Sequence, residues 1–145
     1  MTIWQFSEAV SRRLFAINAV NLLAGVGMLL PGGAFLRGFG SQFVGWALVN
    51  WAIALFGSIG GRKRRASLPD PDAPQVLARE ARNLRRLLWI NSALDVGYMA
   101  GGQWLARRRT SSEQIRGVGW GIVYQGAFLL IFDVIHALLT PEHDA

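Results

Sequence analysis

Polar side chains interrupt four otherwise apolar stretches of this sequence, and they are the residues whose chemistry could serve a function. Amides and a phenol can hydrogen-bond a ligand, and a carboxylate can in addition carry a proton. We therefore expect one ligand-binding site rather than a catalytic one. Its predicted members are Asn18, Asn21, Asn50, Asn91, Asp95, Tyr98 and Asp133.

The spacing of these residues indicates that they share helix faces. Asn91, Asp95 and Tyr98 lie at i, i+4 and i+7, and Asn18 and Asn21 lie three residues apart. Unpaired polar groups are costly in hydrocarbon, so the polar faces should point inward at one another. At about 1.5 Å per residue, the asparagines and aspartates fall within about 15 Å of the predicted cytoplasmic helix ends. This predicts a polar pocket that faces the cytoplasm.

Other roles for the same residues stay open. Asparagines can hold helices together through interhelical hydrogen bonds without binding any ligand. Asp133 is close enough to a helix end to form an ion pair with an arginine such as Arg85. His136 would then be a hydrogen-bonded helix-end residue rather than a ligand. Asp95 has no basic residue at its depth, so it is either protonated or in contact with water.

The sequence lacks the residues and motifs that several kinds of catalytic and metal site require. The chain has no cysteine, so disulfides, thiolate metal sites and cysteine nucleophiles are excluded. His136 is the one histidine in an apolar stretch, which excludes a haem held by two intramembrane histidines. Neither HExxH nor GxSxG occurs, and "GGAFLRGFGS" follows no strand. We expect no catalytic residue, no metal and no cofactor.

The elements that would position these side chains are membrane helices. Of the 145 residues 52% are hydrophobic, and four windows are nearly free of formal charge. These windows are residues 14–30, 43–59, 87–105 and 118–139. Each is long enough as a helix to cross the hydrocarbon layer. The predicted fold is all-α, an integral membrane four-helix bundle.

Two sequence matches predict an internal repeat. "RRLFAIN" (12–18) matches "RRLLWIN" (85–91) at five of seven positions, with an offset of 73. "VGWALV" (44–49) matches "VGWGIV" (118–123) at four of six, with an offset of 74. The predicted parts are a first transmembrane hairpin (1–61), a basic cytoplasmic linker and helix start (62–84) and a second hairpin (85–145). Two tandem parallel repeats would place Asn18 and Asn91 at equal depth, with Trp46 and Trp120 as interfacial anchors.

Local signals suggest where the helices begin and end. Residues 3–6 are expected to form a short interfacial segment before the first span. Gly60 and Gly61 suit the end of the second helix, and Asp70 or Asp72 could start the third. The motifs Gly57-x-x-x-Gly61, Gly97-x-x-x-Gly101 and Gly117-x-x-x-Gly121 are candidate helix contacts, and one of them could support a homodimer.

The basic residues predict the topology and the partners. Ten of the 15 Lys and Arg residues lie in the N-terminal segment and the middle loop, so both termini are expected in the cytoplasm. The run Arg62, Lys63, Arg64 and Arg65 should meet anionic lipid headgroups. In a membrane protein this sorting explains the net charge of +6 without nucleic acid.

The stretch "INSALDVGYMAGG" resembles small bacterial membrane proteins grouped as a family of unknown function. The likeness rests on Asn91, Leu94, Asp95, Tyr98 and the glycines between and after them. The resemblance implies a bacterial origin and four spans, and it implies no activity. The expected location is the bacterial inner membrane.

Two functional hypotheses follow. In the first, the polar pocket binds a small ligand or a lipid headgroup, and in a narrower version Asp95 carries the proton of a coupled transport reaction. In the second, the chain is a structural or accessory subunit of a membrane complex, and its polar residues hold helices together.

Overall fold

The chain folds into four long helices joined by short connections. The computed structural model describes residues 1–30 and 32–142. Its helices are α1 (Ile3–Leu29), α2 (Ala34–Ala66), α3 (Pro74–Arg107) and α4 (Glu113–Leu139), with no strand among the described residues. The predicted all-α, four-helix fold is thus confirmed. Residues 143–145, the end of the predicted second hairpin, lie outside the described part.

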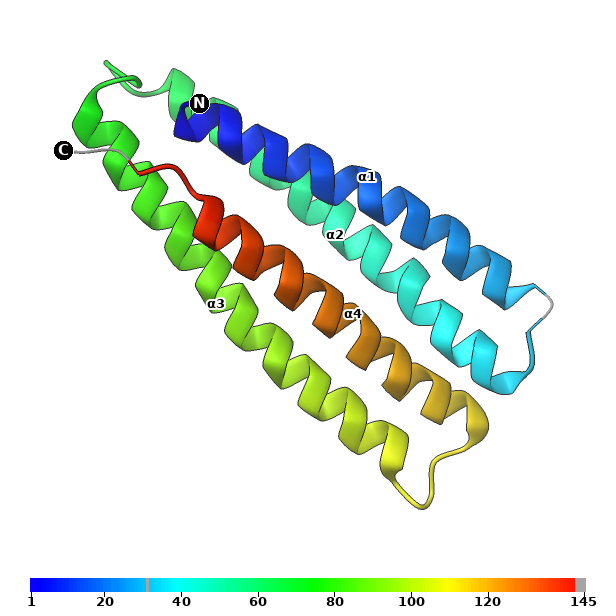
Figure 1. Ribbon diagram of the computed structural model, residues 1–145. Coiled ribbons are helices and arrows are strands. Elements are labelled where there is room, and N and C mark those ends of the chain that lie inside the picture. Colours follow the sequence, from blue (N-terminus) through cyan, green and yellow to red (C-terminus); the bar gives the residue numbers. More distant parts are fainter. Residues whose placement is uncertain (31, 143–145) are drawn as a thin grey trace.

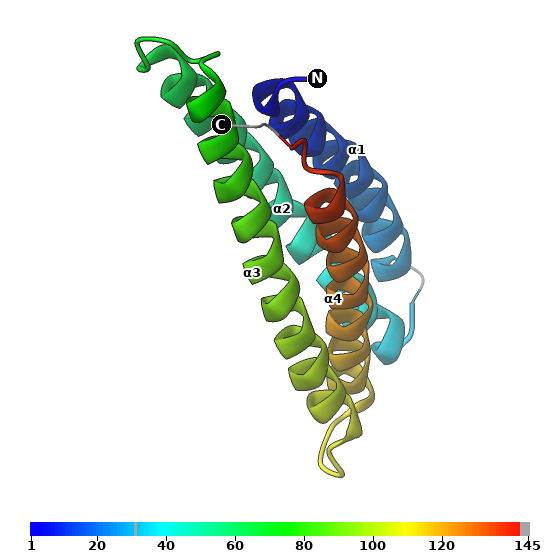
Figure 2. The same ribbon diagram turned by 60° about the vertical axis from the view of Figure 1, so that its left-hand side comes forward.

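The helices form two antiparallel hairpins. α1 packs along α2, α3 packs along α4, and the hairpins meet mainly where α2 packs on α4. α2 and α3 flank α4 and have hardly any backbone contact with each other (Figure 1). The start of α1, the end of α4 and the α2–α3 linker lie at one end of the bundle, which we call the terminal end, and the other two connections lie at the loop end (Figure 2).

Each hairpin closes on a pair of glycines. A Cβ atom on Gly25 would lie 2.9 Å from the carbonyl oxygen of Gly40, and one on Gly102 would lie 2.7 Å from that of Gly119. From the first hairpin to the second, Gly25 corresponds to Gly102 and Gly40 to Gly119, which are offsets of 77 and 79, whereas the sequence matches are offset by 73 and 74. When the two hairpins are aligned on these glycines, the residue equivalent to Asn18 is therefore Asp95, which lies one helical turn after Asn91.

Glycines also join the two hairpins. A Cβ atom on Gly38 would clash with the backbone of Gln114, and one on Gly117 would clash with the backbone of Phe35. The Gly117-x-x-x-Gly121 motif is thus confirmed as a helix contact. Around Gly57-x-x-x-Gly61 and Gly97-x-x-x-Gly101 there is open space within 4 Å of each added Cβ, so neither motif packs within this chain.

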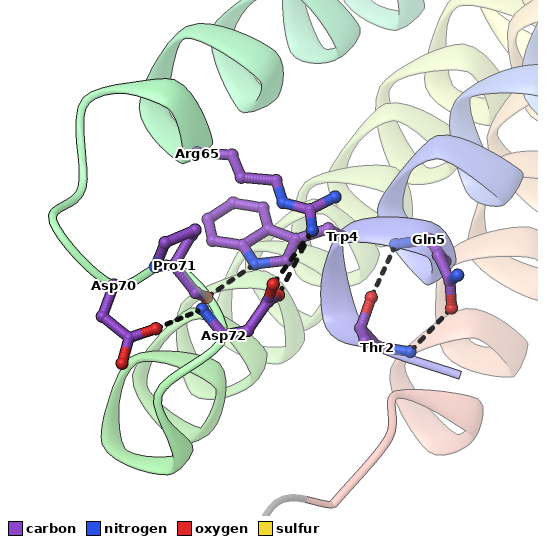
Figure 3. Close-up of polar contacts among 7 residues, drawn as sticks. All are labelled: Thr2, Trp4, Gln5, Arg65, Asp70, Pro71 and Asp72. Carbon is purple, nitrogen blue, oxygen red and sulfur yellow. Dashed lines mark hydrogen bonds and ion pairs between the residues drawn. The ribbon is translucent and has the colours of Figure 1, made fainter.

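Two predicted helix ends are wrong. α2 continues through Gly60 and Gly61 to Ala66, because its last turn carries basic residues that stabilise the negative end of the helix dipole. α3 begins at Pro74 with Ala73 as its N-cap, so neither Asp70 nor Asp72 caps it. Instead Asp72 pairs with Arg65 at 3.2 Å across the linker (Figure 3).

The predicted interfacial segment at the N-terminus is also wrong. A capping box between Thr2 and Gln5 starts α1 at Ile3, so residues 3–6 are its first turn (Figure 3). Ile3, Trp4 and Phe6 are buried in the apolar cluster that fills the terminal end. The Trp4 Nε1 donates a hydrogen bond of 3.0 Å to the carbonyl oxygen of Pro71, which ties α1 to the linker.

The interior of the bundle holds several polar side chains among its apolar core, and the surface exposes many large apolar side chains. Gln125 and Asn18 are among the largest fully buried side chains, together with Ile3. All four helices expose large apolar side chains to their surroundings, for example Leu23, Phe56, Trp104 and Ile131. Among the described residues, α2 and α4 are long and apolar enough to cross a membrane by length and composition.

Candidate functional site

A cleft of about 570 Å³ lies between α2 and α3. The backbones of these two helices hardly touch, which leaves a space between them. α4 and α1 close this space on its inner side. We call it the α2–α3 cleft. Its lining consists of Leu14, Ser41, Gln42, Gly45, Trp46, Val49, Asn50, Ile53, Asn91, Leu94, Asp95, Tyr98, Leu129 and Asp133.

Five of the seven predicted site residues line this cleft. They come from three helices: Asn50 from α2, Asn91, Asp95 and Tyr98 from α3, and Asp133 from α4. The i, i+4, i+7 spacing on α3 therefore places three polar groups on one wall. Asn18 and Asn21 do not line the cleft.

Asn18 lies behind the cleft wall and holds two helices together. Its side chain is 0% exposed, and its Nδ2 donates to the carbonyl oxygen of Leu14 at 2.8 Å. Its Oδ1 accepts hydrogen bonds from Asn50 Nδ2 at 3.1 Å and from Asn21 Nδ2 at 3.4 Å. These asparagines thus form the interhelical link that the second hypothesis assigned to them. Asn18 fixes the orientation of Asn50 at the cleft surface.

The two carboxylates of the cleft are buried and lack a cationic partner. Asp95 is 4% exposed, and its Oδ2 has no hydrogen-bond partner. Asp133 forms no ion pair with any described residue, so its predicted pairing with an arginine is wrong. Arg85 turns toward the end of α4 instead, where it donates to the carbonyl oxygen of Thr140 at 2.9 Å and pairs with Glu142.

His136 is a hydrogen-bonded structural residue near the end of α4, as expected from the sequence. Its Nε2 lies 3.2 Å from Arg13 Nη1, and its Nδ1 lies 2.7 Å from the carbonyl oxygen of Phe132. A guanidinium can only donate, so Nε2 accepts and Nδ1 carries the proton that it donates to Phe132. The neutral ring therefore links α1 to α4.

Part of the α2 wall of the cleft was not predicted from the sequence. Trp46 was expected to be an interfacial anchor, yet it lines the cleft and its ring meets that of Tyr98 edge-on at 5.2 Å. The available signal was helical spacing, since Trp46, Asn50 and Ile53 follow i, i+4 and i+7. Gln125 is buried with both amide atoms unpartnered, and it lies outside the cleft lining.

The cleft opens sideways. Val49 and Ile53 on one rim and Leu94 and Tyr98 on the other are all exposed. Toward the terminal end, Leu14 belongs to the buried apolar cluster that fills that part of the bundle. The cleft therefore differs from the expected pocket facing the terminal end, because α2 and α3 leave their gap along the side of the bundle.

Comparison with known proteins gives a family but no activity. No curated protein and no solved structure matches the sequence. Residues 13–134, which include every residue of the cleft lining, match the profile of the family described as "Family of unknown function (DUF6992)". The resemblance drawn from the α3 sequence to a family of unknown function is confirmed, and the chain belongs to DUF6992.

Proposed function

We propose that all four helices span a membrane. The observation that carries this proposal is the surface of the bundle: every helix exposes large apolar side chains, whereas Asn18, Asn50, Asp95, Gln125 and Asp133 are buried. In water, such a surface would be an apolar patch far larger than monomeric soluble proteins expose. α1 and α3 are not apolar enough by composition alone, because α1 carries Arg12 and Arg13 and α3 carries Asn91 and Asp95.

The proposed membrane is the bacterial inner membrane, with the terminal end in the cytoplasm. The excess of basic residues at that end supports this orientation. Three of the four residues of the basic turn are paired within the chain: Arg62 with Glu8, Arg64 with Glu80 and Arg65 with Asp72. The arginines of these pairs are exposed, and ion pairs at the surface are weak, so the turn is still able to attract anionic headgroups.

We further propose that the α2–α3 cleft binds a small amphiphilic ligand. Its volume falls in the range of about 300–1,000 Å³ that small-molecule sites occupy. An aspartate at the centre of a membrane helix costs about 2.5–3.5 kcal/mol on insertion scales. Asp95, with an unpartnered Oδ2, would recover part of that cost by binding a ligand or a proton. Proton-coupled transport is the narrower version of this function.

The second candidate function is that of a structural or accessory subunit. It is favoured by the link between Asn18 and Asn50, which needs no ligand. It gives no role to the cleft or to the unpartnered oxygen of Asp95, so we rank it second.

Native mass spectrometry of protein purified from its own membranes tests the binding proposal, with two matched variants. Gly45 and Gly97 are both exposed helical glycines with open space within 4 Å of an added Cβ, and of the two only Gly45 lines the cleft. Leucine favours a helix more than glycine does, so neither Gly45→Leu nor Gly97→Leu should unfold the chain.

The wild type and Gly97→Leu are expected to carry the same bound small molecule, and Gly45→Leu is expected to lose it because its side chain fills the cleft. A wild-type spectrum that shows a stoichiometric protein partner and no bound small molecule would favour the subunit function instead.

A further inference from the structure

We infer that the ligand of the α2–α3 cleft is a lipophilic organic cation, an ammonium-type centre with apolar substituents, which enters sideways between α2 and α3. This inference rests on the proposed ligand-binding function and adds the chemical class of the ligand. Four properties of the cleft support it: its charge, its unpartnered oxygen, its aromatic pair and its apolar rim.

The charge of the lining is one-sided. Asp95 and Asp133 are its two ionisable carboxylates, and it contains no lysine, arginine or histidine. Arg13 and Arg85, on the same helices as part of the lining, bond His136 and Thr140 instead, and no ion pair joins Asp95 or Asp133 to a cation of the described residues. No cation of the described chain therefore neutralises the cleft, and a negatively charged headgroup would be repelled from it.

One of these two carboxylates also has an unpartnered oxygen atom. Asp95 is 4% exposed, yet its Oδ2 has no hydrogen-bond partner among the described residues. Buried carboxylates in proteins are normally paired or hydrogen-bonded. A ligand that brings a positive charge into the cleft would supply the partner that the protein does not.

Two aromatic side chains, one from each of the flanking helices, also line the cleft. Trp46 comes from α2 and Tyr98 from α3, and their ring centroids lie 5.2 Å apart in an edge-to-face arrangement. Aromatic faces attract organic cations, tryptophan most strongly, and aromatic sites are a known means of recognising quaternary ammonium groups. Both rings line the cleft together with the two aspartates.

The rim determines which kind of cation fits. Val49, Ile53 and Leu94 line the opening and are exposed, so the ligand meets apolar side chains on its way in. A metal ion prefers several oxygen or nitrogen ligands in one shell, and the described residues offer no group of three His, Cys, Asp or Glu side chains. A cation with apolar substituents fits both the acidic interior and the apolar rim.

Two ions of the same shape and opposite charge test this inference. Tetraphenylphosphonium and tetraphenylborate are titrated calorimetrically into the full-length protein in an uncharged maltoside detergent. The wild type should bind the cation at least about tenfold more tightly than the anion. Asp95→Asn keeps the side-chain shape, removes the charge and should abolish that preference. Asp70→Asn, in the exposed linker, is the matched control and should behave as the wild type.

A second variant and a folding check keep the test decisive. Asp133→Asn should also weaken cation binding, and helical circular dichroism shows whether each variant is folded. Equal binding of both ions, blocked by Gly45→Leu, would overturn the cationic class and leave the ligand-binding cleft standing. Binding of neither ion would overturn the cationic class as well, and the native mass spectra would still decide independently whether the cleft holds a ligand.

Discussion

At the residue scale, the most consequential contact is the hydrogen bond between Asn18 and Asn50. Asn18 is fully enclosed and uses its amide for three hydrogen bonds, one of which crosses from α1 to α2. The same bond presents Asn50 to the α2–α3 cleft. One buried amide thus serves the packing of the first hairpin and the geometry of the candidate site.

A double-mutant cycle measures this bond. Asn18→Leu leaves the buried Nδ2 of Asn50 without its partner and should lower the free energy of unfolding by about 1–3 kcal/mol. The double variant Asn18→Leu/Asn50→Leu should cost less than the sum of the single variants, by about 0.5–2 kcal/mol. Asn83→Leu, at an exposed position of α3, is the control and should change stability by less than about 0.5 kcal/mol. Strictly additive losses, measured by unfolding in detergent, would show that the two amides are not coupled.

At the scale of elements, glycines determine which helices touch and in which register. α2 reaches α4 through Gly38 and Gly117, where the partner backbone occupies the place of a side chain. α2 and α3 have no such contact, and the cleft lies between them. The glycines that pack against a partner backbone thus mark the side on which the two hairpins are closed together.

Two alanine substitutions distinguish these glycines. Gly117→Ala should lower the free energy of unfolding by about 1–3 kcal/mol, because the new Cβ meets the backbone of Phe35. Gly97→Ala adds its Cβ into open space and should raise stability by up to about 1 kcal/mol through helix propensity. Thermal unfolding followed by circular dichroism compares the two variants. Equal effects of the two substitutions would contradict the α2–α4 contact.

At the scale of the whole molecule, the surface of the bundle is largely apolar along its sides, polar side chains are buried among apolar ones in its interior, and charged residues lie toward both ends. Along α3 the exposed apolar side chains run from Leu87 to Trp104, and Asp95 lies midway between them. In the proposed orientation the carboxylate is therefore near the middle of the bilayer, and the sideways opening of the cleft faces lipid.

Single-cysteine labelling tests this placement, and the absence of native cysteine makes each introduced thiol unique. Thr110→Cys, in the α3–α4 loop, should react with a membrane-impermeant maleimide in intact cells. Lys63→Cys, at the terminal end, should react only after permeabilisation. Leu48→Cys, on the exposed apolar face of α2, should stay unreactive in both cases. Ready labelling of Leu48→Cys would contradict a membrane-embedded bundle.

The sequence by itself determined the properties that depend on neighbours along one helix. The number of helices follows from four long apolar windows, and the shared face of Asn91, Asp95 and Tyr98 follows from the helical period. Helix ends were less predictable, because the basic last turn carries α2 through Gly60 and Gly61. Trp46 was assigned to the interface although its spacing to Asn50 placed it on the cleft wall.

The tertiary structure alone decided which polar face meets which. Both Asn18 and Asp95 lie on polar faces, yet Asn18 is satisfied inside the first hairpin and Asp95 keeps an unpartnered oxygen in the cleft. The register of each hairpin is set by the close approach of Gly25 to Gly40 and of Gly102 to Gly119. Such contacts depend on how two helices slide and rotate against each other, and helical periodicity within one chain segment does not encode that position.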